Sequence, residues 1–191
     1  GQPALLNPAA GVYLNTASPT LTWAAPAGTV GVPYTYQVQF DTNSLFTSPD
    51  QTITVSDLFF TPTFSDGTIY WRVRTLNSLG APGAWSLVRS LIIDTSAPAA
   101  PTLSSPLDGA NSVAPKPVLA WVALPGANRY RVQVSTSNTF NTLLVDAQTT
   151  LPSLTLTTAL PQGLYFWRVQ GRDAALNWGS FALARSFSVS L

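Results

Sequence analysis

Aspartate and arginine are almost the only charged residues through which this chain could do chemistry. The sequence contains no histidine, cysteine, methionine or glutamate, and Lys116 is its single lysine. Without a thiol or an imidazole, it has no Cys–His or Ser–His nucleophile and no sulfur or imidazole metal ligand. All eight acids are Asp, several of them in turn sequences such as SDG (65–67) and LDG (107–109). Carboxylate catalysis needs two acids close together in a cleft, so we expect no catalytic residue and no cofactor.

The stretch DTNSLF (41–46) begins like a calcium-binding loop, because Asp41 and Asn43 are two residues apart. Leu45 stands at the third ligand position, the glycine of such loops is missing, and no glutamate can close the site. Asp94 and Asp108 are a second candidate pair, but two carboxylates are few for an ion that takes about 6–8 oxygens. We favour turn chemistry for these residues and expect no metal site.

Arginine and aromatic residues share alternate positions in two short phrases, YWRVR (70–74) and FWRVQ (166–170). Alternate side chains of a strand point to the same face. Such a face can bind an anionic glycan or a protein partner by stacking and bidentate hydrogen bonds. The alternative is cross-strand stacking that only covers the sheet. The candidate binding residues are Tyr70, Arg72, Arg74, Arg131, Phe166, Arg168 and Trp178, the last of them in the loop sequence LNWGS.

The tryptophans of these phrases predict how the strands are oriented. An arginine facing a dry core would be very costly, so Trp71 and Trp167 must point inward while Arg72 and Arg168 stay in water. Burying one indole contributes at most about 4–6 kcal/mol. We expect Trp71→Ala to cost about 3–5 kcal/mol and Arg72→Ala well under about 1 kcal/mol. The expected core pairs are Trp23 with Trp71, and Trp121 with Trp167.

The sequence repeats itself from end to end. The two copies are separated by 94 to 98 residues, about the size of one domain. Each copy alternates apolar and polar residues and is rich in strand-favouring side chains. The Pro-rich stretch DTSAPAAP (94–101) marks a boundary and predicts domains at 1–96 and 97–191. The corresponding phrases are PTLTWAAPAG (19–28) with PVLAWVALPG (117–126), YQVQF (36–40) with YRVQV (130–134), and RSLII (89–93) with RSFSV (185–189).

These phrases resemble fibronectin type III modules of the bacterial surface and secreted kind. The shared features are a Trp on the second strand followed by Pro, a Tyr-x-Val strand, and a turn that leads through a tyrosine into an alternating apolar strand. Tyr165 matches that corner tyrosine, whereas Ile69 takes its place in the first copy. The resemblance implies an all-β protein of two tandem, seven-stranded fibronectin type III or immunoglobulin-like β-sandwiches, with the corner hydrogen bond in the second one.

The composition and the resemblance together limit the functions that this chain can have. Charged residues make up 9% of the chain and the formal net charge is +1, so no long-range field attracts nucleic acid or an anionic membrane. We expect a non-catalytic spacer or interaction module of a larger secreted or cell-surface bacterial protein, with adhesion as a related role. The alternative is a carbohydrate-binding accessory module. The expected partners are other domains of the same polypeptide, another surface protein or a polysaccharide; nucleic acid binding and membrane insertion are not expected.

Overall fold

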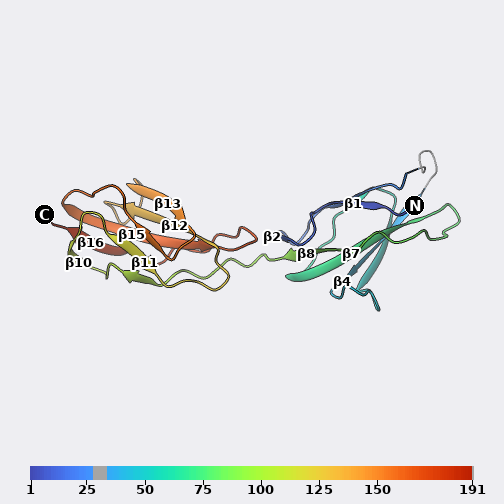
Figure 1. The fold of residues 1–191 in the computed structure, drawn as a ribbon, viewed down its shortest axis with the longest axis horizontal. Helices are drawn as coiled ribbons and strands as arrows, with labels where there is room; N and C mark the ends of the chain where they lie inside the picture. Colours follow the sequence, from blue (N-terminus) through green and yellow to red (C-terminus); the bar gives the residue numbers. More distant parts are fainter. Residues whose placement is uncertain (28–33, 191) are drawn as a thin grey trace. The chain divides into compact units, whose positions relative to one another are not determined.

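The computed structural model describes residues 1–27 and 34–190, which form β-strands and loops without a helix. The chain divides into two units, Gly1–Ser96 (unit 1) and Ala97–Leu191 (unit 2). Each unit contains two sheets that enclose a hydrophobic core of their own (Figure 1). The predicted all-β fold is therefore confirmed. No helix long and apolar enough to cross a membrane occurs in the described residues.

The described residues of unit 1 form eight strands: β1 (Ala4–Asn7), β2 (Val12–Leu14), β3 (Leu21–Ala24), β4 (Thr35–Asp41), β5 (Gln51–Val55), β6 (Phe59–Phe60), β7 (Gly67–Leu76) and β8 (Arg89–Ile93). They form a three-stranded sheet of order β1-β3-β6 and a five-stranded sheet of order β2-β8-β7-β4-β5. The first strand is split between the sheets, because β1 pairs antiparallel with β3 and β2 pairs parallel with β8. Counting β1 and β2 as one strand gives the seven predicted strand positions.

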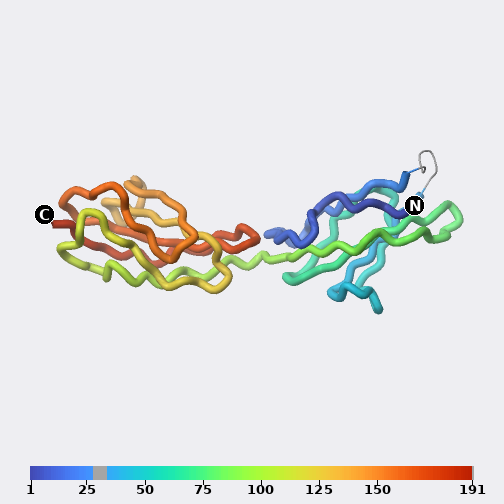
Figure 2. The backbone as a smooth tube through the Cα atoms, viewed as in Figure 1, coloured from blue at the N-terminus to red at the C-terminus, as the bar shows by residue number. Residues whose placement is uncertain are grey.

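Unit 2 repeats this arrangement with β9 (Leu103–Ser105), β10 (Ala110–Val113), β11 (Val118–Trp121), β12 (Arg129–Ser135), β13 (Val145–Thr149), β14 (Ser153–Thr155), β15 (Gly163–Arg172) and β16 (Arg185–Val189). The sheet orders are β14-β11-β9 and β10-β16-β15-β12-β13. Figure 2 traces the backbone through both units, from blue at the N-terminus to red at the C-terminus. Each strand of unit 1 thus has a counterpart in unit 2.

Alternation along β7 and β15 places the tryptophans inside. Trp71 and Trp167 are 0% exposed, and each belongs to the core cluster of its own unit. The next residues, Arg72 and Arg168, lie on the opposite face of the sheet and are half-buried. The predicted strand orientation is therefore confirmed in both units.

Trp23 and Trp121 are the second tryptophan of each core. They share their clusters with Trp71 and Trp167, as predicted. Their ring contacts, however, are made with tyrosines. Trp23 meets Tyr36 edge-on with 5.8 Å between ring centroids, and Trp121 meets Tyr130 edge-on at 5.3 Å. Edge-to-face packing of this kind is the favoured arrangement of aromatic pairs.

The corner tyrosine is present in unit 2 only. The hydroxyl of Tyr165 donates a hydrogen bond of 2.8 Å to the backbone oxygen of Pro161. In unit 1 the same place is taken by Ile69, which is 8% exposed and stands opposite Leu91 as Tyr165 stands opposite Phe187. An isoleucine fills the core but cannot make this bond, so the two units differ here as the sequence predicts.

Candidate functional site

The arginine-bearing phrases lie on the outer face of each five-stranded sheet. In unit 1, β7 runs antiparallel to β4, so Arg72 stands opposite Gln39 and Arg74 opposite Gln37. In unit 2, β15 runs antiparallel to β12, and Arg168 stands opposite Gln133. Directly opposed residues of an antiparallel pair have their side chains side by side. The register therefore brings each guanidinium next to a side-chain amide.

In unit 1 the guanidinium of Arg72 is held between two aromatic rings. Its carbon Cζ lies 4.2 Å from the ring centroid of Phe46 and 4.4 Å from that of Trp85. Cζ of Arg74 is also 4.4 Å from the centroid of Trp85. Nε and Nη2 of Arg72 donate hydrogen bonds of 2.9 and 2.7 Å to Oε1 of Gln39, and Nε of Arg74 donates one of 2.8 Å to Oε1 of Gln37.

Unit 2 contains a matching stack. Cζ of Arg168 lies 4.1 Å from the ring centroids of both Phe140 and Phe181, and Nε donates to Oε1 of Gln133 at 2.9 Å. The neighbouring Arg131 forms an ion pair with Asp146, with Nε to Oδ1 at 2.6 Å. This carboxylate is absent from the stack of unit 1, where Thr52 stands opposite Gln39 on β5.

The phenylalanines reach the stacks from the loops that follow β4 and β12. Phe46 and Phe140 have φ angles of 53° and 55°, in the left-handed region that non-glycine residues rarely adopt. Each closes a turn: the N–H of Phe46 bonds to the oxygen of Asn43 at 3.3 Å, and that of Phe140 to the oxygen of Ser137 at 3.2 Å. Both rings are nearly buried, at 6% and 7% exposure, so these turns fix the covering of the arginines.

Trp85 and Phe181 come from the segment that precedes the last strand of each unit. The next residue in unit 1, Ser86, donates its N–H to the oxygen of Val73 at 2.8 Å, and its Oγ accepts the N–H of Val73 at 3.0 Å. In unit 2 the N–H of Ala182 donates an equivalent backbone bond to β15 at 2.7 Å. These bonds hold the segment alongside the arginine strand and place its aromatic ring over the guanidinium.

The stacks shield their arginines from water. Burial lowers the pKa of Arg72, and the charge of Arg74 lowers it further, while Asp41 acts in the opposite direction. Burial likewise lowers the pKa of Arg168. Guanidinium groups ionise so strongly that both remain charged at neutral pH. A cation over an aromatic ring contributes about 0.5–1 kcal/mol when exposed and about 2 when desolvated, so the stacks stabilise the sheet face that they cover.

Comparison with known proteins agrees with this architecture. No protein-family model and no curated protein sequence matches the chain. Among solved structures, the FN1–FN3 domains of chicken CNTN1 match with a TM-score of 0.65 and 17% identity, over 100% of this chain and 67% of theirs. The fibronectin(III)-like modules of CbhA from Clostridium thermocellum match with a TM-score of 0.57 and 12% identity, over 98% of this chain and 94% of theirs. Both units have the fibronectin type III fold. At these identities the likeness concerns the fold and not the function.

The structure places the candidate residues of the two fibronectin type III units in three settings. Arg72, Arg74 and Arg168 belong to the stacks. Tyr70 and Phe166 are half-buried two residues before Arg72 and Arg168, on the same faces. Trp178 does not join these stacks: it is half-buried, forms a β-bridge with Arg172, and lies with its centroid 5.2 Å from Cζ of that arginine. Arg131 is the seventh candidate and is paired with Asp146.

Sequence reasoning missed the aromatic residues that cover the arginines. Phe46 and Phe140 occupy equivalent places in the repeat, six residues after Phe40 of β4 and Val134 of β12. Trp85 and Phe181 also occupy equivalent places and are 96 residues apart. An aromatic residue kept outside the strand periodicity in both copies was the available signal, but the repeat alone does not say which surface such a ring covers.

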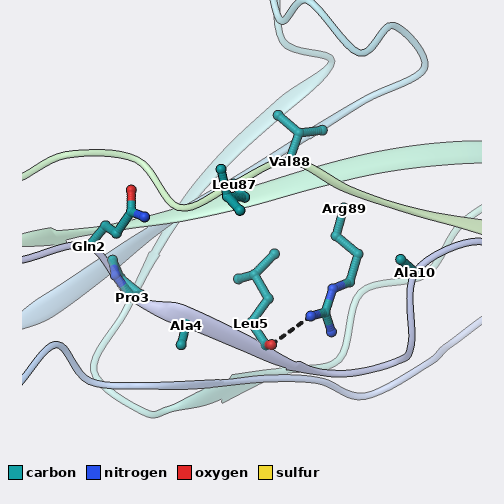
Figure 3. Close-up of a pocket in the computed structure, with 8 residues that line it drawn as sticks. All are labelled: Gln2, Pro3, Ala4, Leu5, Ala10, Leu87, Val88 and Arg89. Carbon is teal, nitrogen blue, oxygen red and sulfur yellow. Dashed lines mark hydrogen bonds between the residues drawn. The ribbon is translucent and has the colours of Figure 1, made fainter.

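A groove at the edge of unit 1 is a further surface feature with polar groups (Figure 3). It measures about 480 Å³ and lies between β1 and the residues around Leu87 and Val88. Arg89 crosses it and donates hydrogen bonds to the backbone oxygens of Leu5 (2.7 Å), Leu6 (2.8 Å) and Pro8 (2.8 Å). These bonds satisfy carbonyls where the first strand is split, so we assign Arg89 a structural role. Unit 2 repeats the arrangement through Arg185, which bonds to the oxygens of Ser104 and Pro106 at 3.2 and 3.3 Å.

The aspartates considered for calcium are engaged in hydrogen bonds to the backbone. Oδ1 of Asp41 accepts the N–H of Asn43 at 2.8 Å, and Oδ1 of Asn43 accepts the N–H of Leu45 at 2.9 Å. Asp108 accepts the N–H of Ser186 at 2.8 Å. The described residues contain no group of three or more acidic side chains that could hold a metal ion. The bonds of Asp41 and Asn43 are the local side-chain-to-backbone bonds that these residue types make in turns. The bond of Asp108 instead joins it to β16, 78 residues along the chain.

Proposed function

We propose that this chain is a non-catalytic spacer in a larger secreted or cell-surface bacterial protein, in which it keeps other domains apart. Fibronectin type III-like modules act as spacer or interaction modules of larger proteins and are generally non-catalytic. The proposed location rests on the resemblance of the repeated phrases to bacterial surface modules. The observation that carries the proposal is that the linker between the units is held at both of its ends.

The first end of the linker is bound to unit 1 by Asp66, in the turn before β7. Its Oδ1 accepts the N–H of Thr95 at 3.1 Å and the hydroxyl of Thr95 at 2.8 Å. Its Oδ2 accepts the hydroxyl of Ser96 at 2.9 Å. The N–H of Ser96 also bonds to Oδ1 of Asp94 at 3.2 Å. One carboxylate therefore holds two consecutive linker residues.

The second end of the linker packs on unit 2 at Gly179. An ideal Cβ on this glycine would lie 2.2 Å from the backbone oxygen of Pro98 and 3.5 Å from that of Ala99. The close approach of the linker therefore needs a residue without a side chain. The N–H of Gly179 bonds to the oxygen of Gly171 at 2.8 Å, which holds the glycine at the end of β15.

Only Ala97 lies between these two anchored stretches. Proline fixes its own φ near −65° and restricts the residue before it to extended conformations. Pro98 therefore limits the freedom of Ala97 as well as its own. A joint with so few free torsions behaves as a stiff spacer, in contrast to a Gly/Ser-rich linker of the same length, which is a flexible coil.

Pulsed electron-spin resonance tests the stiffness of the joint directly. The chain has no cysteine, so Thr54→Cys and Gln148→Cys, both at exposed strand positions, give one spin label in each unit. We expect a single narrow distance distribution. Inserting Gly-Ser-Gly-Ser between Ala97 and Pro98 should widen it about twofold or more, because the joint then becomes a flexible coil.

The control places the same insertion between Leu79 and Gly80, in an exposed loop within unit 1, and should leave the width unchanged. A distribution in the unaltered chain that is already as broad as that of the linker-insertion variant would overturn the spacer proposal.

A further inference from the structure

Unit 1 lacks the carboxylate that unit 2 places on the outer face of its five-stranded sheet. In unit 2 this carboxylate, Asp146, pairs with Arg131, whose place on the strand is taken in unit 1 by Gln37. Among the described residues, Arg72 and Arg74 form no ion pair, and their hydrogen bonds go to the neutral side-chain oxygens of Gln39 and Gln37. Arg74 donates through Nε alone. A guanidinium has five N–H donors, so four donors of Arg74 have no partner in the part of the chain that the structure describes.

In unit 2 an aspartate on the neighbouring strand binds the arginine on the outer face of the sheet. Asp146 on β13 accepts hydrogen bonds from Nε and Nη2 of Arg131 and, at 3.3 Å, from Nε2 of Gln133. Asp146 stands opposite Gln133 in the β12–β13 pairing. The same position in unit 1, opposite Gln39, is held by Thr52. Unit 2 therefore supplies a carboxylate from its own edge strand, and unit 1 does not.

The two acids at the end of β4 and just before β5, Asp41 and Asp50, do not make up for this difference. Asp41 attracts Arg72, but it is 4% exposed and its Oδ1 accepts the N–H of Asn43. Asp50 accepts the N–H of Thr42 at 2.9 Å. The six residues outside the description, 28–33, have the sequence GTVGVP and contain no acid. Two guanidiniums thus share the ring of Trp85, and no described carboxylate forms an ion pair with either of them, so this face carries positive charge.

We propose that the Arg74 face of unit 1, formed by Gln37, Gln39, Thr52, Arg72 and Arg74, binds carboxylate side chains of an acidic segment of a partner protein. Charge complementarity and the bidentate geometry of guanidinium with carboxylate carry the proposal. A carboxylate is also the group that the matching face of unit 2 already holds. This role goes beyond that of a spacer, because unit 1 would itself bind a partner protein.

The ring geometry favours a protein segment over a sugar. The guanidinium carbons of Arg72 and Arg74 each lie 4.4 Å from the ring centroid of Trp85, so this ring already contacts two cations. Phe46 is 6% exposed and has Arg72 on one face. Phe46 is nearly buried and Trp85 contacts two guanidiniums, so little of either ring is left for a sugar to stack on, whereas the N–H groups of Arg74 that lack a partner among the described residues can donate to a carboxylate.

The test is titration of the whole chain with a hexaglutamate peptide, followed by NMR at low salt. The Nε–H of Arg74 and the Nε1–H of Trp85 should shift on binding, while resonances of Arg168 should not. Arg74→Gln should weaken binding at least tenfold. Thr52→Asp, which supplies an internal carboxylate as Asp146 does, should weaken it to a similar extent. Added salt should weaken it as well, because the attraction is between exposed charges.

Asn15→Asp is the matched control, because it adds the same charge to unit 1 after β2, at the opposite edge of the sheet from β5. It should leave the affinity within about twofold, and unchanged unfolding midpoints show that the variants are folded. No shift with hexaglutamate overturns the proposal. Equal loss in Asn15→Asp and Thr52→Asp overturns it too, as does tighter binding of polygalacturonate than of hexaglutamate with the same dependence on Arg74.

Discussion

The guanidinium carbon of Arg72 lies 4.4 Å from the ring centroid of Trp85, while its neighbour Trp71 is fully buried on the opposite face of the same strand. Strand β7 is therefore covered on both sides, by the core on one and by an aromatic stack on the other. The face that carries Arg72, which the alternation of apolar and polar residues predicts to be exposed to solvent, is therefore half-buried. The cost of substitutions along β7 follows from this two-sided covering.

Trp71→Ala should cost about 3–5 kcal/mol of unfolding free energy in unit 1, because it removes a completely buried indole and leaves a cavity. Urea titration followed by resonances of each unit measures the effect separately, and unit 2 should keep its midpoint. Trp71→Phe retains a ring and keeps the unit measurable if the alanine variant does not fold; its cost should be smaller.

Arg72→Ala should cost more than the sequence suggests, about 1–2 kcal/mol instead of well under 1. The substitution removes the contacts of the guanidinium with the rings of Phe46 and Trp85 and its two hydrogen bonds to Gln39. Leu87→Ala is the control, since Leu87 is 79% exposed and should change stability by less than about 0.5 kcal/mol. A larger loss for Arg72→Ala than for Trp71→Ala would contradict the strand orientation.

The sequence was sufficient to predict the fold and the orientation of its central strands. Alternation with a period of two makes Trp71 and Arg72 face opposite ways, and a charged side chain decides which way is outward. The covering of Arg72 was not predictable in this way. Phe46 reaches it from a turn with a φ of 53° and Trp85 from a segment outside the strands, and loop conformations of this kind carry no periodic pattern.

The linker was predictable only in part. Its proline content marks a boundary and an extended chain, but its stiffness depends on Asp66 and Gly179, which lie 29 and 81 residues from their contacts Thr95 and Pro98. Contacts over such separations depend on the tertiary fold that brings the turn before β7 and the end of β15 to the chain. A single sequence offers no local signal for them.

Tyr165→Phe should lower the stability of unit 2 by about 1 kcal/mol, because it removes the hydrogen bond to the backbone oxygen of Pro161 and leaves that acceptor without its partner. The ring itself remains to fill the core. The midpoint of unit 2 in a urea titration measures the loss. Tyr13→Phe, at a position 49% exposed in unit 1, should leave the unfolding midpoints of both units unchanged. Equal effects of the two variants would show that the corner hydrogen bond does not stabilise unit 2.

Gly179→Ala should both destabilise unit 2, by about 1–3 kcal/mol, and loosen the linker. Its Cβ would come within 2.2 Å of the oxygen of Pro98, a distance at which the backbone must move. The spin-label distance distribution should broaden along with the fall in midpoint. Gly163→Ala is the matched control, because its Cβ meets nothing closer than 3.5 Å. That variant should keep the spin-label distance distribution narrow, and a broad distribution would show that the test is not specific.

Acid should release the first end of the linker. Hydrogen bonds from the side chain and the backbone N–H of Thr95, and from the side chain of Ser96, lower the pKa of Asp66 below its ordinary value. A carboxylate with a lowered pKa in the folded state contributes stability that is fully present above its unfolded pKa of about 3.9 and is lost as the pH falls through the folded value. The N–H resonance of Thr95 should therefore titrate with a midpoint below about 3.9, and the spin-label distribution should broaden over the same range.

Asp66→Ala should show the broad distribution at neutral pH, with no further change in acid. If the resonance of Thr95 instead moves with pH in Asp66→Ala as it does in the unaltered chain, the carboxylate that holds this end of the linker is not Asp66.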